Sequence, residues 1–229
     1  MSIRPELKPL SAVQRLRAHL RVFFVDHGIF RSLFYANLHR FGQRAFRSAQ
    51  PSPRQIEKWS RRHGLRSVVS IRGSGWHEAH MRLEADACDR LGLRMESLHG
   101  FGSRDLPTRE DLNRLQQFFQ SLDHPVLFHC KSGADRAGFL SVLYLHLHEG
   151  VPLELAMRQL RLWPFGHIRQ ANTGILDHFF DAYLQYQSRH PEVDFMSWVN
   201  TVYDREALIR AFRPRFSFSW ITDRLLRRE

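Results

Sequence analysis

Cysteine is scarce in this chain, because only Cys88 and Cys130 occur among its 229 residues. Two cysteines do not form the disulfide framework of a small secreted domain, so we expect a reducing compartment, and the cytoplasm first. No stretch approaches the roughly 18 uninterrupted apolar residues that a membrane-spanning helix requires. The apolar run Val22-Phe23-Phe24-Val25 ends at Asp26, which is too short for a secretory leader. We therefore expect neither a membrane span nor a cleaved leader.

Lysine is also rare, since only three of the 34 basic residues are lysines. The arginines nevertheless give a formal net charge of +11, and residues 1–50 carry nine basic residues against Glu6 and Asp26. This excess predicts anionic partners, such as phosphates or lipid headgroups. A nucleic-acid partner is not expected, because no recognition motif occurs. The hydrophobic content of 43% is enough for a packed core, which excludes global disorder.

The two ends of the chain differ in composition and hydrophobic pattern from its centre. Residues 10–41 place apolar side chains at spacings of three and four with arginines between them, which predicts amphipathic helix broken near Gly28. Docking of this helix on the domain is the simpler interpretation, and interfacial contact with an anionic membrane is the alternative. Residues 216–228 have a similar mixture of aromatic, aliphatic and arginine side chains.

Between the ends, helical and strand-like segments alternate. A turn at residues 47–53 is followed by predicted helices at 53–63, 76–91, 108–122, 136–149, 152–162 and 172–189. Short apolar runs at 67–71, 93–97 and 126–128 predict strands. This alternation predicts an α/β fold with a central, mainly parallel sheet flanked by helices. We expect a basic helical extension at 1–43, a domain at 44–190 and a helical basic extension at 191–229.

The segment from His129 to Arg136 carries the strongest chemical signal. Cys130 follows an apolar strand, and the small residues up to Arg136 can curl so that their backbone N–H groups converge on one oxyanion. The next helix starts there, and its N-terminal dipole favours a thiolate at Cys130 and a phosphate beside it. Arg136 can hold two phosphate oxygens at once. These features predict Cys130 as a nucleophile and Arg136 as a phosphate clamp.

Spacing alone does not single out Cys130, because Cys88 also has an arginine six positions on, at Arg94. Cys88 lies within a predicted helix and no apolar strand precedes it, so we interpret it as a structural residue. The histidines lack metal-ligand spacing, and we expect neither a metal nor a cofactor.

The sequence His129-Cys130-Lys131-Ser132-Gly133-Ala134-Asp135-Arg136 resembles the phosphate-binding signature of dual-specificity-type protein tyrosine phosphatases. The upstream strand that ends in Arg72 and the opening Arg47-Ser48-Ala49-Gln50-Pro51 are similar to bacterial and fungal members. The resemblance covers residues 44–188. It implies a phosphocysteine intermediate on Cys130 and phosphate binding by the loop residues, which are Lys131, Ser132, Gly133, Ala134, Asp135 and Arg136.

The resemblance also implies a general acid on an upstream loop. Asp105 is the best match, 25 residues before Cys130, with Glu110 and Asp111 as weaker candidates. His129 is expected to hydrogen-bond locally and to orient the cysteine, and Asp135 to shape substrate preference. The family usually has Ser or Thr after the signature arginine, whereas this chain has Ala137, which predicts a slow second step.

Together these features predict a phosphatase acting on phosphate monoesters, with phosphotyrosine or phosphoserine/threonine proteins as the default substrates. A phosphoinositide or inositol phosphate is the alternative substrate, favoured by Lys131 and the basic ends. A phosphate-binding module with little turnover is the second alternative.

Overall fold

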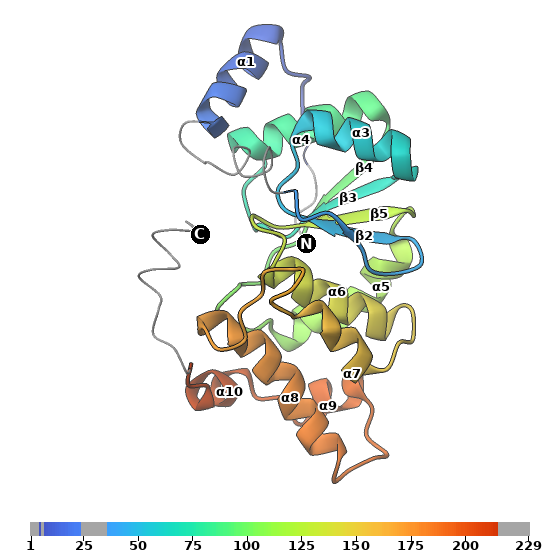
Figure 1. The fold of residues 1–229 in the computed structure, drawn as a ribbon, viewed down its shortest axis with the longest axis vertical. Coiled ribbons are helices and arrows are strands. Elements are labelled where there is room, and N and C mark those ends of the chain that lie inside the picture. Colours follow the sequence, from blue (N-terminus) through green and yellow to red (C-terminus); the bar gives the residue numbers. More distant parts are fainter. Residues whose placement is uncertain (1–4, 6, 24–35, 215–229) are drawn as a thin grey trace. The chain divides into compact units, whose positions relative to one another are not determined.

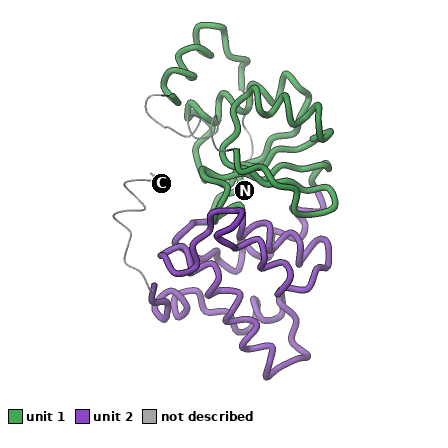
Figure 2. The backbone as a smooth tube through the Cα atoms, in the orientation of Figure 1, with its two compact units in different colours: residues 1–99, 122–137 green, residues 100–121, 138–229 purple. Residues whose placement is uncertain are grey.

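The computed structural model describes residues 5, 7–23 and 36–214. The chain divides into two compact units (Figure 2), of which unit 1 comprises residues 1–99 and 122–137, and unit 2 comprises residues 100–121 and 138–229. Helix α6 (Asp135–Leu147) begins in unit 1 and continues in unit 2. The predicted helix beyond Gly28 lies largely outside the described residues, as does the segment 216–228.

Unit 1 is built on a five-stranded sheet with the order β1-β2-β5-β3-β4. Its strands are β1 (His39–Arg40), β2 (Ala45–Ser48), β3 (Ser67–Ser70), β4 (Arg94–Ser97) and β5 (Val126–His129). Only β1 pairs antiparallel, with β2, and all other pairs are parallel. The predicted α/β class with a mainly parallel sheet is therefore confirmed.

Helices α3 (Pro53–His63) and α4 (Ala79–Leu91) cover one face of this sheet (Figure 1). Phe46, Val68, Met95 and Leu127 stand in one register row across the sheet and pack against Ile56, Trp59, Met81 and Cys88 of the two helices. Successive side chains of a strand alternate between faces, so His129, two residues after Leu127, also faces α4.

Local sequence explains where α3 begins and ends. The Ser52 hydroxyl accepts a hydrogen bond from the Gln55 N–H, and the Gln55 side chain accepts one from the Ser52 N–H. Gly64 then ends the helix with a left-handed φ of 64°. Helix α1 (Ala12–Arg21) begins with the same type of capping box, formed by Ser11 and Gln14.

Unit 2 is helical. Its elements are α5 (Arg109–Ser121), α6 from Gly138 onward, α7 (Leu153–Ala156), the 3₁₀ turns Met157–Gln159 and Asn172–Gly174, α8 (Ile175–Gln187), α9 (Phe195–Thr201) and α10 (Arg205–Ala211). Its core is aromatic: Phe179 contacts Phe139 and Trp198 with ring centroids 5.5 and 5.6 Å apart, and Phe119 meets Tyr144 edge to face.

Three local predictions are wrong. Residues 45–48 form the strand β2 although the sequence predicted a turn from Arg47, because Arg47 is buried by partners distant in sequence. Residues 39–40 pair as β1 within a stretch predicted to be helical. The helix predicted for 152–162 shortens to α7 and one 3₁₀ turn, since Leu162 and Trp163 are exposed and Pro164 follows.

Candidate active site

The segment from Cys130 to Arg136 joins the central strand β5 to helix α6. Strand β5 lies between two parallel partners, β2 and β3, so its carboxyl end opens at a sheet edge where ligands bind in open α/β sheets. Cys130 directly follows the strand, and Asp135 and Arg136 are the first residues of α6. The predicted strand, loop and helix are therefore all present.

Four consecutive carbonyl groups of the loop accept hydrogen bonds from other parts of unit 1. The Gln50 N–H donates to the Lys131 carbonyl at 3.3 Å, and Asn37 Nδ2 donates to the Ser132 carbonyl at 3.0 Å. One guanidinium nitrogen of Arg47 donates to the carbonyls of both Gly133 and Ala134, at 2.7 and 2.8 Å. The carbonyls are thus held away from the loop centre.

This arrangement fixes the direction of the N–H groups. In a trans peptide the N–H points opposite to the carbonyl before it, so outward carbonyls turn the following N–H groups inward. The Gly133 N–H donates to Cys130 Sγ at 3.2 Å. A ring of inward N–H groups at a helix N-terminus stabilises an oxyanion or a thiolate. Such a loop can hold an oxyanion beside the Cys130 sulfur.

Gly133 is required by this geometry. Its φ is +73°, and a Cβ atom at this position would lie 2.6 Å from the Ala49 nitrogen and 2.6 Å from the Ser48 carbonyl carbon. Both neighbours are backbone atoms, so they cannot move aside like a flexible side chain. Residue 133 therefore has to be glycine for the loop to lie this close to the end of β2.

Arg136 is partly exposed, and its Nη1 donates to the Arg72 carbonyl at 3.2 Å. This bond uses one of the five N–H groups of the guanidinium. The arginine is thereby oriented while its remaining donors stay available for a ligand. Arg72 follows β3, so two neighbouring parallel strands contribute to the site.

His129 has a buried partner distant in sequence. Its Nε2 lies 2.5 Å from Glu84 Oε1 of α4, and Glu84 Oε2 accepts a hydrogen bond from Gln50 Nε2 at 2.7 Å. Gln50 Oε1 accepts a hydrogen bond from Arg72 Nη1 at 3.3 Å. His129, Glu84 and Gln50 are each no more than 1% exposed. His129 is thus oriented by a helix 45 residues away in sequence, not by a local bond.

The other loop residues differ in exposure. Lys131 and Ser132 are partly exposed, whereas Ala134 and Asp135 are buried. Ser132 Oγ accepts a bond from the Ala134 N–H at 3.4 Å. Ala137 is fully buried in the first turn of α6, where it presents a methyl group in place of a hydroxyl.

Asp105 belongs to unit 2 and is half exposed. Arg205 Nη2 lies 2.5 and 2.6 Å from its two carboxylate oxygens, and the Leu106 N–H donates to Oδ1 at 2.8 Å. Burial would lower the pKa of Arg205, but its bond to Asp105 and the charges of Asp105 and Glu206 raise it. Asp105 is therefore held by an ion pair with a residue outside the range of the predicted resemblance.

The two weaker acid candidates occupy the start of α5. Asp111 accepts bonds from the Thr108 N–H and hydroxyl at 3.3 and 2.8 Å, so its carboxylate helps to cap the helix. Glu110 is an exposed residue of the first helical turn, where a negative charge complements the helix dipole.

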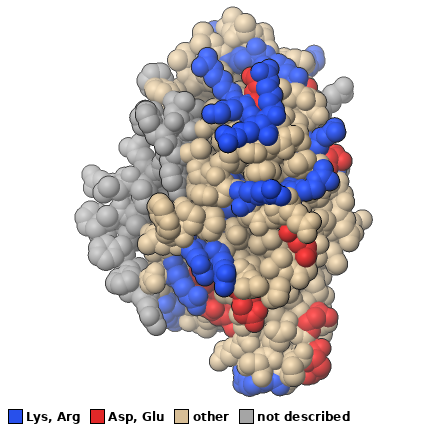
Figure 3. Space-filling model, turned by 45° about the vertical axis from the view of Figure 1, so that its right-hand side comes forward, with Lys and Arg blue, Asp and Glu red and all other residues tan. Residues whose placement is uncertain are grey.

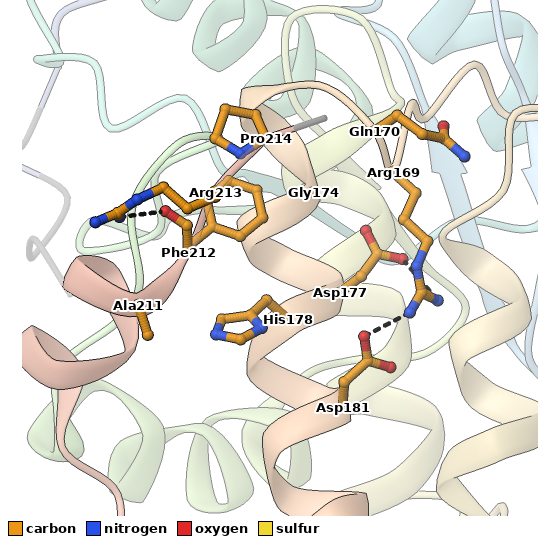
Figure 4. Close-up of a pocket in the computed structure, with 10 residues that line it drawn as sticks. All are labelled: Arg169, Gln170, Gly174, Asp177, His178, Asp181, Ala211, Phe212, Arg213 and Pro214. Atoms are coloured by element: carbon orange, nitrogen blue, oxygen red, sulfur yellow. Dashed lines mark hydrogen bonds and ion pairs between the residues drawn. The ribbon is translucent and has the colours of Figure 1, made fainter. Parts of the chain in front are cut away.

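Within the described residues, no cluster of His, Cys, Asp and Glu side chains could hold a metal ion. The described helices include none long and apolar enough to span a membrane. Unit 2 contains a pocket of about 600 Å³ that no residue of the Cys130 loop lines (Figure 4). Arg169 in this pocket is paired with Asp181 and Asp177 (Figure 4), so its charge is already balanced.

Residues 46–158, which include the Cys130 loop, match the model of the tyrosine phosphatase family. This segment, which carries the nucleophile candidate, is therefore similar to that family. The match begins in β2 and ends in the 3₁₀ turn after α7. The resemblance predicted from the 129–136 signature is thereby confirmed.

Solved structures of cysteine-based phosphatases are similar to the chain. The core catalytic domain of the PP-IP phosphatase SIW14 from S. cerevisiae shares 16% identity, with 69% of this chain and 94% of that chain covered and a TM-score of 0.50. P. aeruginosa TpbA shares 19% identity, with 77% of this chain and 90% of that chain covered and a TM-score of 0.49. Human DUSP28 shares 15% identity, with 65% of this chain and 95% of that chain covered and a TM-score of 0.47. At 16% identity, the similarity to SIW14 shows that the two proteins share a fold. A search of the curated proteins finds no match.

Sequence reasoning missed the residues that support the loop from outside. Arg47, Asn37 and Glu84 hold the loop carbonyls or His129 through contacts that span 45 to 95 residues. Arg47 was recognised as part of a family-like opening, but its buried position was not. A charged residue inside an otherwise apolar strand is the one signal that points to such a role.

Proposed function

We propose that the protein is a phosphatase that hydrolyses phosphate monoesters through a phosphocysteine intermediate on Cys130. The observation that carries this proposal is the loop itself. Its carbonyls are bonded to other segments of unit 1, and the Gly133 N–H donates to Cys130 Sγ. Arg136 supplies the planar donor set for two phosphate oxygens. The family match of residues 46–158 supports the same chemistry.

In the first step the Cys130 thiolate attacks phosphorus. The S–P bond forms as the bond from phosphorus to the leaving oxygen breaks, and the leaving oxygen takes a proton from Asp105. The loop N–H groups and Arg136 bind the three non-bridging oxygens as negative charge develops on them, which lowers the barrier more than it stabilises the bound substrate.

In the second step water attacks the phosphocysteine and Asp105 takes its proton. The O–P bond forms, the S–P bond breaks and the thiolate is restored with release of inorganic phosphate. A hydroxyl after Arg136 would donate to the departing sulfur, and Ala137 has none. Breakdown of the phosphocysteine is therefore the slow step in this proposal.

Phosphotyrosine or phosphoserine/threonine proteins are the default substrates. The partly exposed Lys131 in the Cys130 loop favours a more highly charged phosphate ester, such as an inositol phosphate or phosphoinositide, as the alternative. TpbA has been solved with pTyr bound, and SIW14 is a PP-IP phosphatase. The cytoplasm remains the expected compartment.

Phosphate release by the purified protein tests the proposal. Wild type and Cys130→Ser are compared, with a chelator present, on a phosphotyrosine peptide, a phosphoserine peptide, phosphoinositides and inositol polyphosphates. We expect release that requires Cys130, and the preferred compound assigns the substrate class. Retained phosphate binding without release from any compound would instead identify a binding module.

The role of Asp105 is tested with aryl phosphates of graded leaving-group pKa. Asp105→Asn is expected to lower the rate about 10²-fold to 10⁴-fold for poor leaving groups and little for good ones, because only poor leaving groups need the proton. Asp111→Asn, which changes the weaker acid candidate, is the comparison and should leave the dependence on leaving group unchanged. An equal loss on all leaving groups would assign Asp105 a structural role through Arg205.

A further inference from the structure

Helix α1 carries an exposed apolar ridge. Val13, Leu16 and Leu20 of α1 and Phe23, two residues after its end, follow one another at spacings of three, four and three residues, which places the three helical residues on one side of α1. Their exposed fractions are 60, 60, 48 and 40%. Among the described residues of unit 1, every large hydrophobic side chain that is at least 40% exposed belongs to this ridge.

The opposite side of α1 attaches the helix to α4. Leu10, Ala18 and the buried Val22 pack with Ala79 and Leu83. Arg15 donates to both carboxylate oxygens of Asp86, at 3.0 and 3.2 Å. The Leu10 N–H also donates to Asp86 at 3.2 Å. The orientation of α1 is therefore fixed by specific contacts that leave the ridge outside.

This orientation reverses the usual pattern. A surface helix normally turns its apolar stripe toward the core and its charges toward water. Within α1 itself, Ala18 and Arg15 make the contacts with α4, whereas the larger Val13, Leu16 and Leu20 face outward. A contiguous apolar ridge of this kind marks an interaction surface. Among the described residues of unit 2, Leu155 and Val202 are exposed as single side chains, and Leu162 and Trp163 are an adjacent pair that lies outside any helix.

Basic side chains border the ridge. Arg17 and Arg21 are exposed on α1, which has no acidic residue. On the other side of the ridge, Arg15, Arg54 and Arg90 lie close enough to His19 to act on its pKa. Burial lowers that pKa most, and these three positive charges lower it further. Helix α3 continues the basic surface, because Arg54, Lys58, Arg61 and Arg62 line a shallow depression with Glu57. Lys and Arg side chains gather over this part of unit 1 in Figure 3.

The shape and charge of this surface favour a lipid surface over a protein. A standard protein interface buries about 800 Å² per partner, and four side chains that are at most 60% exposed offer much less. A narrow convex ridge needs no complementary groove when it enters the boundary between headgroups and acyl chains. Arginines beside it then meet anionic headgroups.

We propose that α1 docks unit 1 on an anionic membrane surface, with Val13, Leu16, Leu20 and Phe23 entering the interface and Arg17 and Arg21 contacting lipid phosphates. This inference concerns binding and does not depend on the proposed catalytic function. Binding requires both the ridge and the charge, and it weakens as salt screens the arginines.

Sedimentation of the full chain with vesicles tests the proposal. The vesicles are phosphatidylcholine alone or phosphatidylcholine mixed with phosphatidylserine. We expect binding to the mixed vesicles only. Arg17→Glu with Arg21→Glu should weaken binding at least about 25-fold, since each basic residue near an anionic surface contributes about fivefold. Leu16→Glu with Leu20→Glu should weaken it by about tenfold or more.

The matched control is Leu155→Glu with Val202→Glu, which changes two exposed apolar residues of unit 2 and should leave vesicle binding unchanged. Thermal unfolding of each variant identifies any that fail to fold, and Leu16→Gln with Leu20→Gln provides a second ridge variant. Equal binding by the ridge and control variants would overturn the proposal. So would a dimer in sedimentation equilibrium that the ridge variants abolish, because the ridge would then be a protein interface.

Discussion

Cys88 and Cys130 each stand six residues before an arginine, and both are buried, but their surroundings differ. Cys88 lies in α4 and packs into the apolar cluster of unit 1, and its carbonyl accepts a bond from the Leu93 N–H. Around Cys130 the loop carbonyls are bonded to Arg47, Asn37 and Gln50, which frees N–H groups for a ligand. A cysteine and an arginine at this spacing form a candidate site only where the backbone between them is not used by a helix.

The two cysteines themselves give the largest expected contrast. Cys130→Ser should lower phosphate release about 10⁴-fold or more, because the hydroxyl is a far weaker nucleophile than the thiolate. Cys88→Ser should leave turnover per folded molecule unchanged and cost about 1 to 3 kcal/mol of stability, because it buries a hydroxyl in an apolar cluster. Steady-state kinetics and chemical denaturation of both variants test this, and comparable catalytic losses would contradict it.

The two arginines extend the contrast. Arg136→Lys should lower turnover about 10²-fold to 10³-fold, because a lysine cannot bind two phosphate oxygens with a planar fork. Arg94 pairs with Glu96 at 2.8 Å, an interaction that lysine can also make, so Arg94→Lys should have no effect on kcat/KM. A small effect of Arg136→Lys would show that its charge alone suffices.

Each cysteine–arginine segment contains one glycine, and these two glycines test how closely the Cys130 loop lies against strand β2. Gly133 and Gly92 both have positive φ, but a Cβ at Gly92 would meet nothing within 4 Å. Gly92→Ala should cost about 1 kcal/mol for the left-handed backbone alone. Gly133→Ala should cost more and lower turnover about a hundredfold, because the loop must shift away from β2. Similar denaturation midpoints and similar turnover would contradict the clash.

Glu84 joins the two regions, since it lies on α4 four residues before Cys88 and contacts His129. Glu84→Ala should lower kcat about tenfold by releasing His129, with a cost of about 1 to 3 kcal/mol for each buried group left unpaired. Glu84→Gln keeps an acceptor for His129 and should recover most of kcat. A change in stability alone, with kcat intact, would make the bond purely structural.

The smallest expected effect concerns Asp86, the residue of α4 that holds helix α1. Burial would raise the pKa of Asp86, but the hydrogen bonds from Arg15 and Leu10 and the charges of Arg15 and Arg90 hold it below its ordinary value. A lowered folded-state pKa contributes stability above the ordinary carboxyl pKa, and this contribution is lost as the pH falls through the folded-state value. Asp86→Asn should cost about 1 kcal/mol and speed amide exchange in residues 10–22 without changing turnover. Unchanged exchange would show that apolar packing alone holds α1.

Prediction from sequence succeeded where the signal is local. Helix α3 was predicted with its observed limits, because the capping box of Ser52 and Gln55 and the final Gly64 are read from neighbouring residues. The apolar runs that became β3 and β5 were equally clear. Strand β2 was missed because Arg47 and Ser48 are polar, and the residues that pair with them in the fold are 81 or more positions away in the sequence.

The candidate site divides in the same way. The sequence by itself determined the nucleophile candidate, the arginine and the need for a small-residue loop, because these follow from residue types and their order. Only the tertiary structure decided that Arg47, Asn37 and Glu84 support that loop, that Asp105 is paired with Arg205, and that the apolar ridge of α1 faces outward. Such contacts depend on which segments the sheet order and helix packing bring together, and local sequence carries no record of them.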